Sequence, residues 1–174
     1  MGFLETKRLS LIPLEEEHTE LIIKWRNDKD ILFNFFSYMP LTRAEHLHWL
    51  NSKPHDRIDL MIQIKKTSDF IGVVNLSNID HRNQHCEYGI LIGEKSFWGK
   101  GYAREATECI LDYAFDVLNM RKVYLYVQKE NERAIKLYTS IGFEVEGDFR
   151  EEFFKNGRFV NILKMAKFRG IKSV

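Results

Sequence analysis

The segment from Glu87 to Glu105 constrains the fold most strongly, and it reads EYGILIGEKSFWGKGYARE. An apolar stretch runs into a turn in which Gly99 and Gly101 bracket Lys100, and a helical pattern begins at Tyr102. The first N–H groups of a helix lack partners within the helix and carry the positive end of its dipole. Glycine lets the backbone approach an anion closely and adopt positive φ. The segment therefore predicts a strand–turn–helix that binds a pyrophosphate.

Two widespread phosphate-binding loops do not fit this spacing. A P-loop needs four residues between its glycines followed by Lys-Ser or Lys-Thr, and the chain has no such string. The dinucleotide-binding fingerprint needs a third glycine or alanine where Arg104 stands. The alternative is an ordinary turn whose glycines serve only its geometry.

Whole-chain numbers limit the classes of function. The chain has 174 residues, 44% of them hydrophobic and 29% charged, so we expect one domain over residues 1–174. A formal net charge of +1 argues against a nucleic-acid-binding surface. No apolar run approaches the roughly 18 residues of a membrane span. The N-terminus carries no apolar secretory region, and Cys86 and Cys109 have no paired spacing. We expect a cytoplasmic protein with free thiols and no membrane partner.

Hydrophobic periodicity and turn signals predict alternating strands and helices. The short connections between residues 58 and 92 predict an antiparallel meander, and Asn156-Gly157 predicts a tight hairpin. The aromatic-rich segment 28–39 has no clear period. The expected strands are 8–14, 58–65, 70–76, 85–92, 122–127, 143–150 and 158–167, and the expected helices are 16–26, 42–50, 102–118 and 131–140. This order predicts an α/β protein of the α+β type.

The order of elements and two motifs resemble the GNAT superfamily of N-acetyltransferases. WGKGYA is similar to that family's acetyl-CoA pyrophosphate loop, Q/R-x-x-G-x-G/A, with Trp98 at the position of Gln or Arg. NERAIKLYTSIGF, residues 131–143, is similar to its N-x-x-A-x-x-x-Y-x-x-x-G-F segment. The resemblance implies a mixed, mostly antiparallel sheet of about seven strands, splayed between the fourth and fifth, with about four flanking helices. It also implies acetyl-CoA as cosubstrate.

The resemblance assigns the cofactor contacts. Backbone N–H groups of the glycine turn would hold the pyrophosphate, and a backbone N–H near Leu91–Ile92 would meet the thioester oxyanion. Lys95 is a further cation available to the phosphates, and Asn131 either contacts the pantetheine arm or serves only as a helix N-cap. The expected cofactor-binding set is Leu91, Ile92, Trp98, Gly99, Lys100, Gly101, Tyr102, Ala103, Arg104 and Asn131.

The same resemblance assigns two catalytic residues. Tyr138 matches the general acid that protonates the departing thiolate, although it can also be a core tyrosine on its helix face. Glu87 lies where related enzymes carry a glutamate base, and strand alternation turns it to the face of Gly89. The alternative for Glu87 is an outward strand charge, with His81 and Glu130 as further candidates for the base.

A metal site is not expected. His81, His85 and Cys86 lie close together in the sequence, but they do not have the spacing of a zinc site. Group transfer by direct attack of an amine needs no metal ion.

The resemblance to the superfamily implies that acceptor contacts come from the first two helices and the loop joining them. The expected contacts are Trp25, Arg26, Asn27, His46 and Trp49. This pattern resembles acetyltransferases of nucleotide-linked 4-amino sugars in the pseudaminic-acid pathway, of the UDP-4-amino-4,6-dideoxy-N-acetyl-β-L-altrosamine type. Arg26 can meet a diphosphate. The aromatic residues can stack on a nucleobase or a sugar face, or simply pack the helices together, and they are Phe35, Phe36, Tyr38 and Trp49. The alternatives are ribosomal-protein N-terminal acetylation, spermidine or other polyamine acetylation, and a non-catalytic acyl-CoA sensor. A homodimer is a further expectation.

Overall fold

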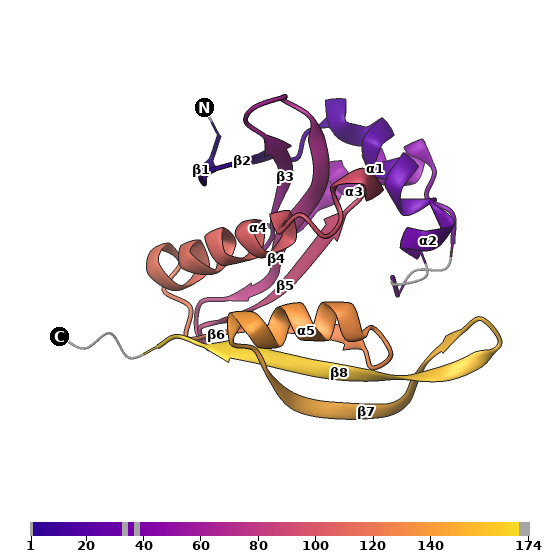
Figure 1. Ribbon diagram of the computed structural model, residues 1–174, viewed down its shortest axis with the longest axis vertical. Helices are drawn as coiled ribbons and strands as arrows, with labels where there is room; N and C mark the ends of the chain where they lie inside the picture. The colour runs from indigo at the N-terminus through magenta and orange to yellow at the C-terminus, as the bar shows by residue number, and fades with distance from the viewer. Residues whose placement is uncertain (1, 33–34, 37–38, 171–174) are drawn as a thin grey trace.

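The computed structural model describes residues 2–32, 35–36 and 39–170. One mixed sheet runs through it in the order β1-β2-β3-β4-β5-β6-β8-β7, and only the β5–β6 pair is parallel (Figure 1). The strands are β1 (Leu4–Glu5), β2 (Leu9–Pro13), β3 (Ile58–Ile64), β4 (Phe70–Asp80), β5 (His85–Ile92), β6 (Lys122–Gln128), β7 (Glu144–Lys155) and β8 (Arg158–Phe168). The mostly antiparallel sheet predicted from the sequence is confirmed. The described part has eight strands where about seven were expected, because the two-residue β1 pairs with β2.

The α-helices are α1 (Thr19–Arg26), α2 (Lys29–Leu32), α3 (Arg43–Ser52), α4 (Tyr102–Asp112) and α5 (Glu132–Ile141). Short 3₁₀ turns cover Glu16–His18 and Lys95–Phe97, and a π-helical turn, Tyr113–Val117, extends α4. The four predicted helices are all present. The additional helix α2 lies in the segment that has no clear period, and Tyr38 falls outside the described residues.

Local capping chemistry explains the helix boundaries. Thr42 accepts a hydrogen bond from the Glu45 backbone N–H at 3.2 Å, while the Glu45 carboxylate accepts one from the Thr42 N–H at 2.9 Å. This is the predicted capping box at the start of α3. Asn131 caps α5 through the Ala134 N–H, and Gly142 ends the helix in the left-handed region at φ 99°.

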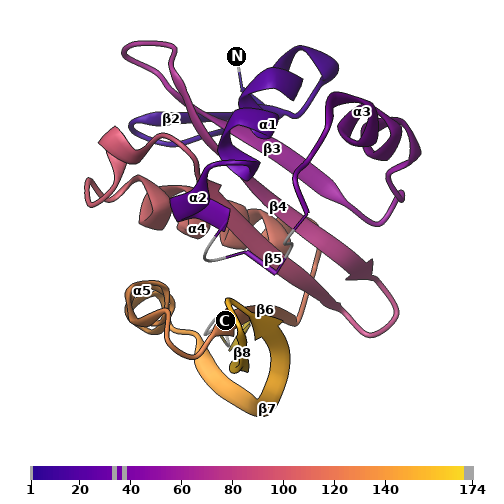
Figure 2. The same ribbon diagram turned by 90° about the vertical axis from the view of Figure 1, so that its right-hand side faces the viewer.

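Alternation along the strands separates two cores. On β3, Leu60 and Ile62 face the core that contains Ile110 of α4, whereas Met61 faces the core that contains Trp25 of α1. The helices α4 and α5 therefore cover one face of the sheet, and α1, α2 and α3 cover the other (Figure 2).

The contact between β5 and β6 is short. Only His85–Glu87 pair with Lys122–Tyr124 among the described residues, and the two strands diverge beyond these pairs (Figure 1). The β4–β5 and β6–β8 ladders continue past that point. The predicted splay is thus confirmed, and it lies between β5 and β6 because β1 shifts the strand count by one.

Candidate active site

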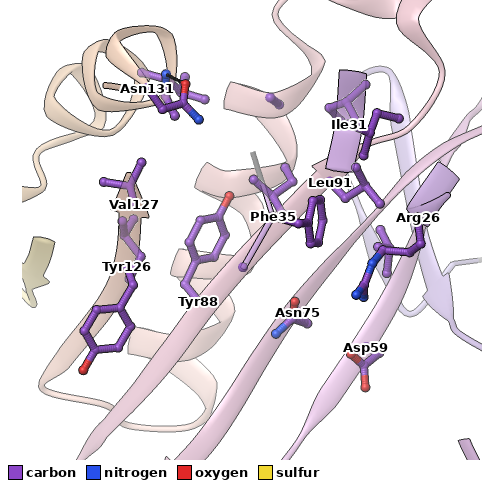
Figure 3. Close-up of a pocket in the computed structure, with 18 of the residues that line it drawn as sticks. Arg26, Ile31, Phe35, Asp59, Asn75, Tyr88, Leu91, Tyr126, Val127 and Asn131 are labelled. Carbon is purple, nitrogen blue, oxygen red and sulfur yellow. Dashed lines mark hydrogen bonds between the residues drawn. The ribbon is translucent and has the colours of Figure 1, made fainter. Parts of the chain in front are cut away.

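A cavity of about 940 Å³ lies where β5 and β6 diverge, and it extends to the first turn of α4, to α5 and to the helices α1–α3. This volume is near the upper end for small-molecule sites, which span about 300–1,000 Å³. Arg26 and Phe35 lie on one side of Tyr88, whereas Tyr126, Val127 and Asn131 lie on the other (Figure 3). The cavity therefore extends from β6 and the start of α5 to the helices α1–α3.

The glycine turn has the geometry expected of an anion site. Gly99 and Gly101 have φ values of 76° and 81°, a region that side chains rarely adopt. Gly101 is the N-cap of α4, and no side chain caps this helix, in contrast to α3 and α5. The first N–H groups of α4 are thus left for a ligand, which fits a bound pyrophosphate.

Two residues outside the predicted set hold this turn. Arg8 donates to the Lys100 carbonyl oxygen at 3.0 Å and to Glu105 Oε2 at 2.6 Å. Its guanidinium carbon lies 4.3 Å from the centre of the Tyr102 ring. Glu105 also accepts hydrogen bonds from the Thr6 hydroxyl and the Arg8 N–H. Thus Glu105 fixes Arg8, and Arg8 fixes the backbone of the turn.

The predicted phosphate-binding cations have other partners. Lys95 forms ion pairs with Asp28 and Asp30, and it does not line the cavity. Lys100 lies over the Phe97 ring, at 5.2 Å from its centre.

Arg104 lines the cavity but pairs with Glu108 at 2.8 Å and donates to Ser140. The candidate phosphate site therefore consists mainly of backbone N–H groups. Of the three predicted cations, Arg104 is the one that also lines the cavity.

The indole at the edge of the turn is anchored to β5. Trp98 donates from Nε1 to the Ile92 carbonyl oxygen at 2.8 Å. The Arg133 guanidinium lies 5.2 Å from the centre of an aromatic ring of Trp98, and both residues line the cavity. Arg133 is a lining cation that the sequence analysis missed, since a variable position inside a motif carries no signal of its own. Leu91 and Ile92 also line the cavity, beyond the last β5–β6 pair.

Tyr138 lies on α5 with its side chain at the cavity. Its ring packs near Tyr88 and Phe143, with centroid separations of 6.1 and 5.9 Å. Its hydroxyl has no hydrogen-bond partner among the described residues. Burial raises the pKa of Tyr138 to about 12, so the phenol keeps its proton at neutral pH. A protonated phenol facing the cavity can act as a general acid.

Glu87 lies on the paired part of β5 and lines the same cavity. Its Oε2 accepts a hydrogen bond from Asn78 Nδ2 at 2.9 Å, which orients the carboxylate. The other two candidates for the base, His81 and Glu130, do not line this cavity. Of the acid and base candidates named from the sequence, Tyr138 and Glu87 thus line this cavity.

Three of the five predicted acceptor residues line the cavity, namely Arg26, His46 and Trp49. His46 is buried, with Nδ1 at 3.2 Å from the Thr19 hydroxyl. Burial lowers the pKa of His46, and the nearby Arg26 and Arg43 lower it further. The imidazole is therefore neutral at pH 7.

Trp25 and Asn27 have structural contacts instead. Trp25 is 1% exposed, and a Cβ on Gly93 would lie 2.1 Å from its indole, so only glycine allows this packing. Its Nε1 donates to Glu94 at 2.8 Å. Asn27 exchanges two hydrogen bonds with the backbone of Leu41, which joins α1 to the start of the α3 region. Neither residue lines the cavity.

Within the described part of the chain, no group of three or more His, Cys, Asp or Glu residues is arranged to hold a metal ion. The same residues contain no helix that is both long enough and apolar enough to span a membrane.

Residues 8–144 match the family described as the acetyltransferase (GNAT) domain. The chain belongs to the GNAT acetyltransferase family. Spermidine N(1)-acetyltransferase of Escherichia coli (strain K12) is 33% identical over 161 residues, which are 92% of this chain and 86% of the relative. Acetyltransferase PseH of Campylobacter jejuni (serotype O:23/36, strain 81-176) is 30% identical over 132 residues, 76% of this chain and 80% of the relative.

Among solved structures, spermidine N-acetyltransferase from Vibrio cholerae in complex with CoA and spermine aligns with a TM-score of 0.88 and 30% identity. The alignment covers 94% of this GNAT chain and 96% of that structure. The predicted GNAT fold, the N-acetyltransferase activity and acetyl-CoA as cosubstrate are confirmed. The superfamily named from the sequence is confirmed, but neither its amino-sugar branch nor its ribosomal branch is.

Proposed function

We propose that this GNAT enzyme acetylates a primary amine of a small molecule, with Glu87 as base and Tyr138 as acid. The observation that carries the proposal is that both side chains line one cavity at the β5–β6 splay. The same cavity includes the glycine turn before the uncapped N-terminus of α4. Donor binding and proton transfer thus share one space.

Each group has a defined task. A substrate ammonium must lose a proton before it attacks, and each unit by which its pKa exceeds the pH costs about 1.4 kcal/mol. Glu87 accepts that proton, directly or through a water molecule. Tyr138 delivers a proton to the departing thiolate sulfur. Acetyl-CoA supplies the acetyl thioester, and backbone N–H groups of the turn and of α4 hold its pyrophosphate. One backbone N–H of the Leu91–Ile92 segment stabilises the oxyanion.

The relatives support a polyamine acceptor better than the nucleotide-linked amino sugar predicted first, because those at 33% identity are spermidine acetyltransferases. The amino sugar stays the second candidate because Arg26, a residue suited to phosphate, lines the cavity. Ribosomal-protein N-terminal acetylation is a third possibility. Trp25 and Asn27 are not included among the proposed acceptor contacts, since both lie outside the cavity lining.

The test is thiol release from acetyl-CoA with spermidine, a UDP-linked 4-amino sugar and an N-terminal peptide as parallel acceptors. We expect the enzyme to acetylate at least one of these acceptors, and the acceptor that reacts identifies the substrate class. Glu87→Gln should lower kcat by about 10²–10⁴-fold, whereas Glu130→Gln, outside the main cavity lining, should not. Binding of acetyl-CoA without turnover of any amine would instead support an acyl-CoA sensor.

A further inference from the structure

Arg26 is a cation inside the cavity that lacks a counter-charge. It is the last residue of α1, it is half-buried, and its guanidinium projects into the space above Asn75 and Asp59 (Figure 3). Its Nε is buried and has no hydrogen-bond partner among the described residues. Its described contact is the Phe35 ring, whose centre lies 4.7 Å from the guanidinium carbon. Buried arginine N–H groups ordinarily have acceptors, so the site is incomplete without one.

The neighbouring carboxylate does not supply that acceptor. Asp59 receives three hydrogen bonds from Arg57, at 2.8 to 2.9 Å, and Lys53 lies 3.8 Å from its Oδ2. The Asp59 carboxylate thus already faces two cations, Arg57 and Lys53. Arg26 adds a third positive charge to this wall of the cavity, which Arg26, Arg57 and Asp59 form. Burial lowers the pKa of Arg26, and repulsion from Arg57 lowers it further. Arginine nevertheless stays protonated in proteins, so the wall carries an excess of positive charge.

A second buried nitrogen near this end of the cavity belongs to His46. His46 lines the cavity, and its Nε2 is buried with no hydrogen-bond partner among the described residues. A neutral imidazole whose Nε2 carries the proton is a donor, as is a guanidinium N–H. Arg26 of α1 therefore offers a donor to the cavity, and His46 of α3 would add one beside it when its Nε2 carries the proton. Carboxylates and phosphates accept such a set of hydrogen bonds.

We infer that Arg26, with His46 beside it, binds an oxyanion carried by the acceptor, a carboxylate or a phosphate remote from the amine that is acetylated. The inference rests on the proposed acetyl transfer and adds a specificity determinant to it. Unlike the relatives, which support a polyamine, this anion site favours the amino-sugar candidate, because a second ammonium would meet Arg26 and Arg57 without a free carboxylate among the described residues near them. An amine that carries a phosphate or carboxylate would neutralise the wall.

The decisive experiment uses protein saturated with CoA, so that the phosphate-binding turn is occupied and a second anion must bind elsewhere. Inorganic pyrophosphate and succinate are titrated separately by calorimetry, which distinguishes a phosphate site from a carboxylate site. Wild type is compared with Arg26→Met, Arg26→Lys and Arg43→Met. Arg43 is a matched control because it lies on α3 in ion pairs with Glu16 and Glu20, outside the cavity lining.

We expect the CoA-saturated wild type to bind at least one of the two anions. Arg26→Met should weaken that binding at least tenfold, and Arg26→Lys should weaken it less. Arg43→Met should stay within twofold of wild type, and all variants should keep the wild-type circular dichroism spectrum. Equal affinity in wild type and Arg26→Met, or no anion binding by folded, CoA-saturated wild type, would overturn the inference.

Kinetics gives an independent readout. The anion that binds should inhibit competitively against the amine acceptor, and its inhibition constant should rise in Arg26→Met. Turnover of the UDP-linked 4-amino sugar that Arg26→Met leaves unchanged would contradict the inference while leaving the proposed acetyl transfer intact. Loss of CoA binding or of all turnover in wild type would instead count against the proposed function. The two failures are therefore distinguishable.

Discussion

Arg8 and Glu105 are joined by a 2.6 Å contact between Nε and Oε2, and this ion pair ties the start of β2 to the first turn of α4. Because Arg8 also donates to the Lys100 carbonyl, the pair positions the backbone that is proposed to hold pyrophosphate. Removing one charge-assisted hydrogen bond costs about 1.5–3 kcal/mol. Arg8→Met should therefore raise the KM for acetyl-CoA by about tenfold or more and change kcat little. The neighbouring Lys7→Met serves as control, and a fall in kcat at constant KM would contradict this role.

The positive φ of Gly101 allows a second test of whether the glycine turn binds acetyl-CoA. Alanine at φ 81° costs about 1–2 kcal/mol, and its Cβ would lie 3.4 Å from Arg8 Nη2. Gly157 has the same φ with open space around it, in the hairpin between β7 and β8. Gly101→Ala and Gly157→Ala should both lower Tm, but only Gly101→Ala should raise the KM for acetyl-CoA. If both substitutions changed the KM for acetyl-CoA equally, the glycine turn would not be part of the acetyl-CoA site.

Replacing Tyr138 with phenylalanine tests the general acid. Thiolates are good leaving groups, so we expect kcat to fall only about tenfold to a few hundredfold. Tyr113→Phe is the matched control, because Tyr113 lies in the turn after α4 and does not line the cavity. Since the pKa of Tyr138 is about 12, the acid form persists as the pH rises and is lost only near that value. An unchanged kcat in Tyr138→Phe would exclude the assignment.

The pH dependence of stability should report on His46. Its folded-state pKa lies below the ordinary value of 6.5, because burial and then nearby arginines disfavour the charged ring. Folding thus favours the neutral ring of His46. Its contribution to the stability of the folded protein is present above pH 6.5 and is lost as the pH falls below that value. His46→Gln should make Tm less sensitive to acid between about pH 7 and 5. His48→Gln, exposed on the same helix, should keep the wild-type slope in calorimetric scans.

Cys86 should not take part in acetyl transfer. The residue is fully buried, and burial raises the pKa of its thiol to about 12, so almost no thiolate exists at neutral pH. Cys86→Ser should retain turnover, while the buried hydroxyl lowers the free energy of unfolding by about 1–3 kcal/mol. Cys86→Ala, which adds no polar group, is the comparison. An acyl-enzyme trapped on Cys86 by mass spectrometry would contradict the direct mechanism.

Signals that act over a few residues predicted much of the fold. The capping box at Thr42, the cap at Asn131 and the Asn156-Gly157 turn are each completed by neighbours in the sequence, so their boundaries could be located. The two-residue β1 and the four-residue α2 were missed. Elements this short contain only about one period of a hydrophobic pattern, which is too little to recognise, and tertiary contacts decide whether they form.

The site was less predictable where contacts join distant parts of the chain. Arg8 and Glu105 are 97 residues apart, and no local pattern indicates that they meet. Trp25 and Arg26 are adjacent in the sequence, but consecutive helix residues point in different directions. One is buried against Gly93, and the other reaches the cavity. A motif that contains both could not reveal which one faces a ligand.

The short β5–β6 contact has a consequence for hydrogen exchange. Among the described residues, the backbone connection between the β1–β5 part of the sheet and the β6–β8 part is made by three residue pairs and by two hydrogen bonds that the Gln84 carbonyl oxygen accepts from the Arg121 and Lys122 N–H groups. Segments with few shared hydrogen bonds can open as separate cooperative units. A ligand that fills the cavity touches both parts, so its binding should slow amide exchange in β6 and β8 as well as in β5. Bound acetyl-CoA would then link two parts of the sheet that otherwise open separately.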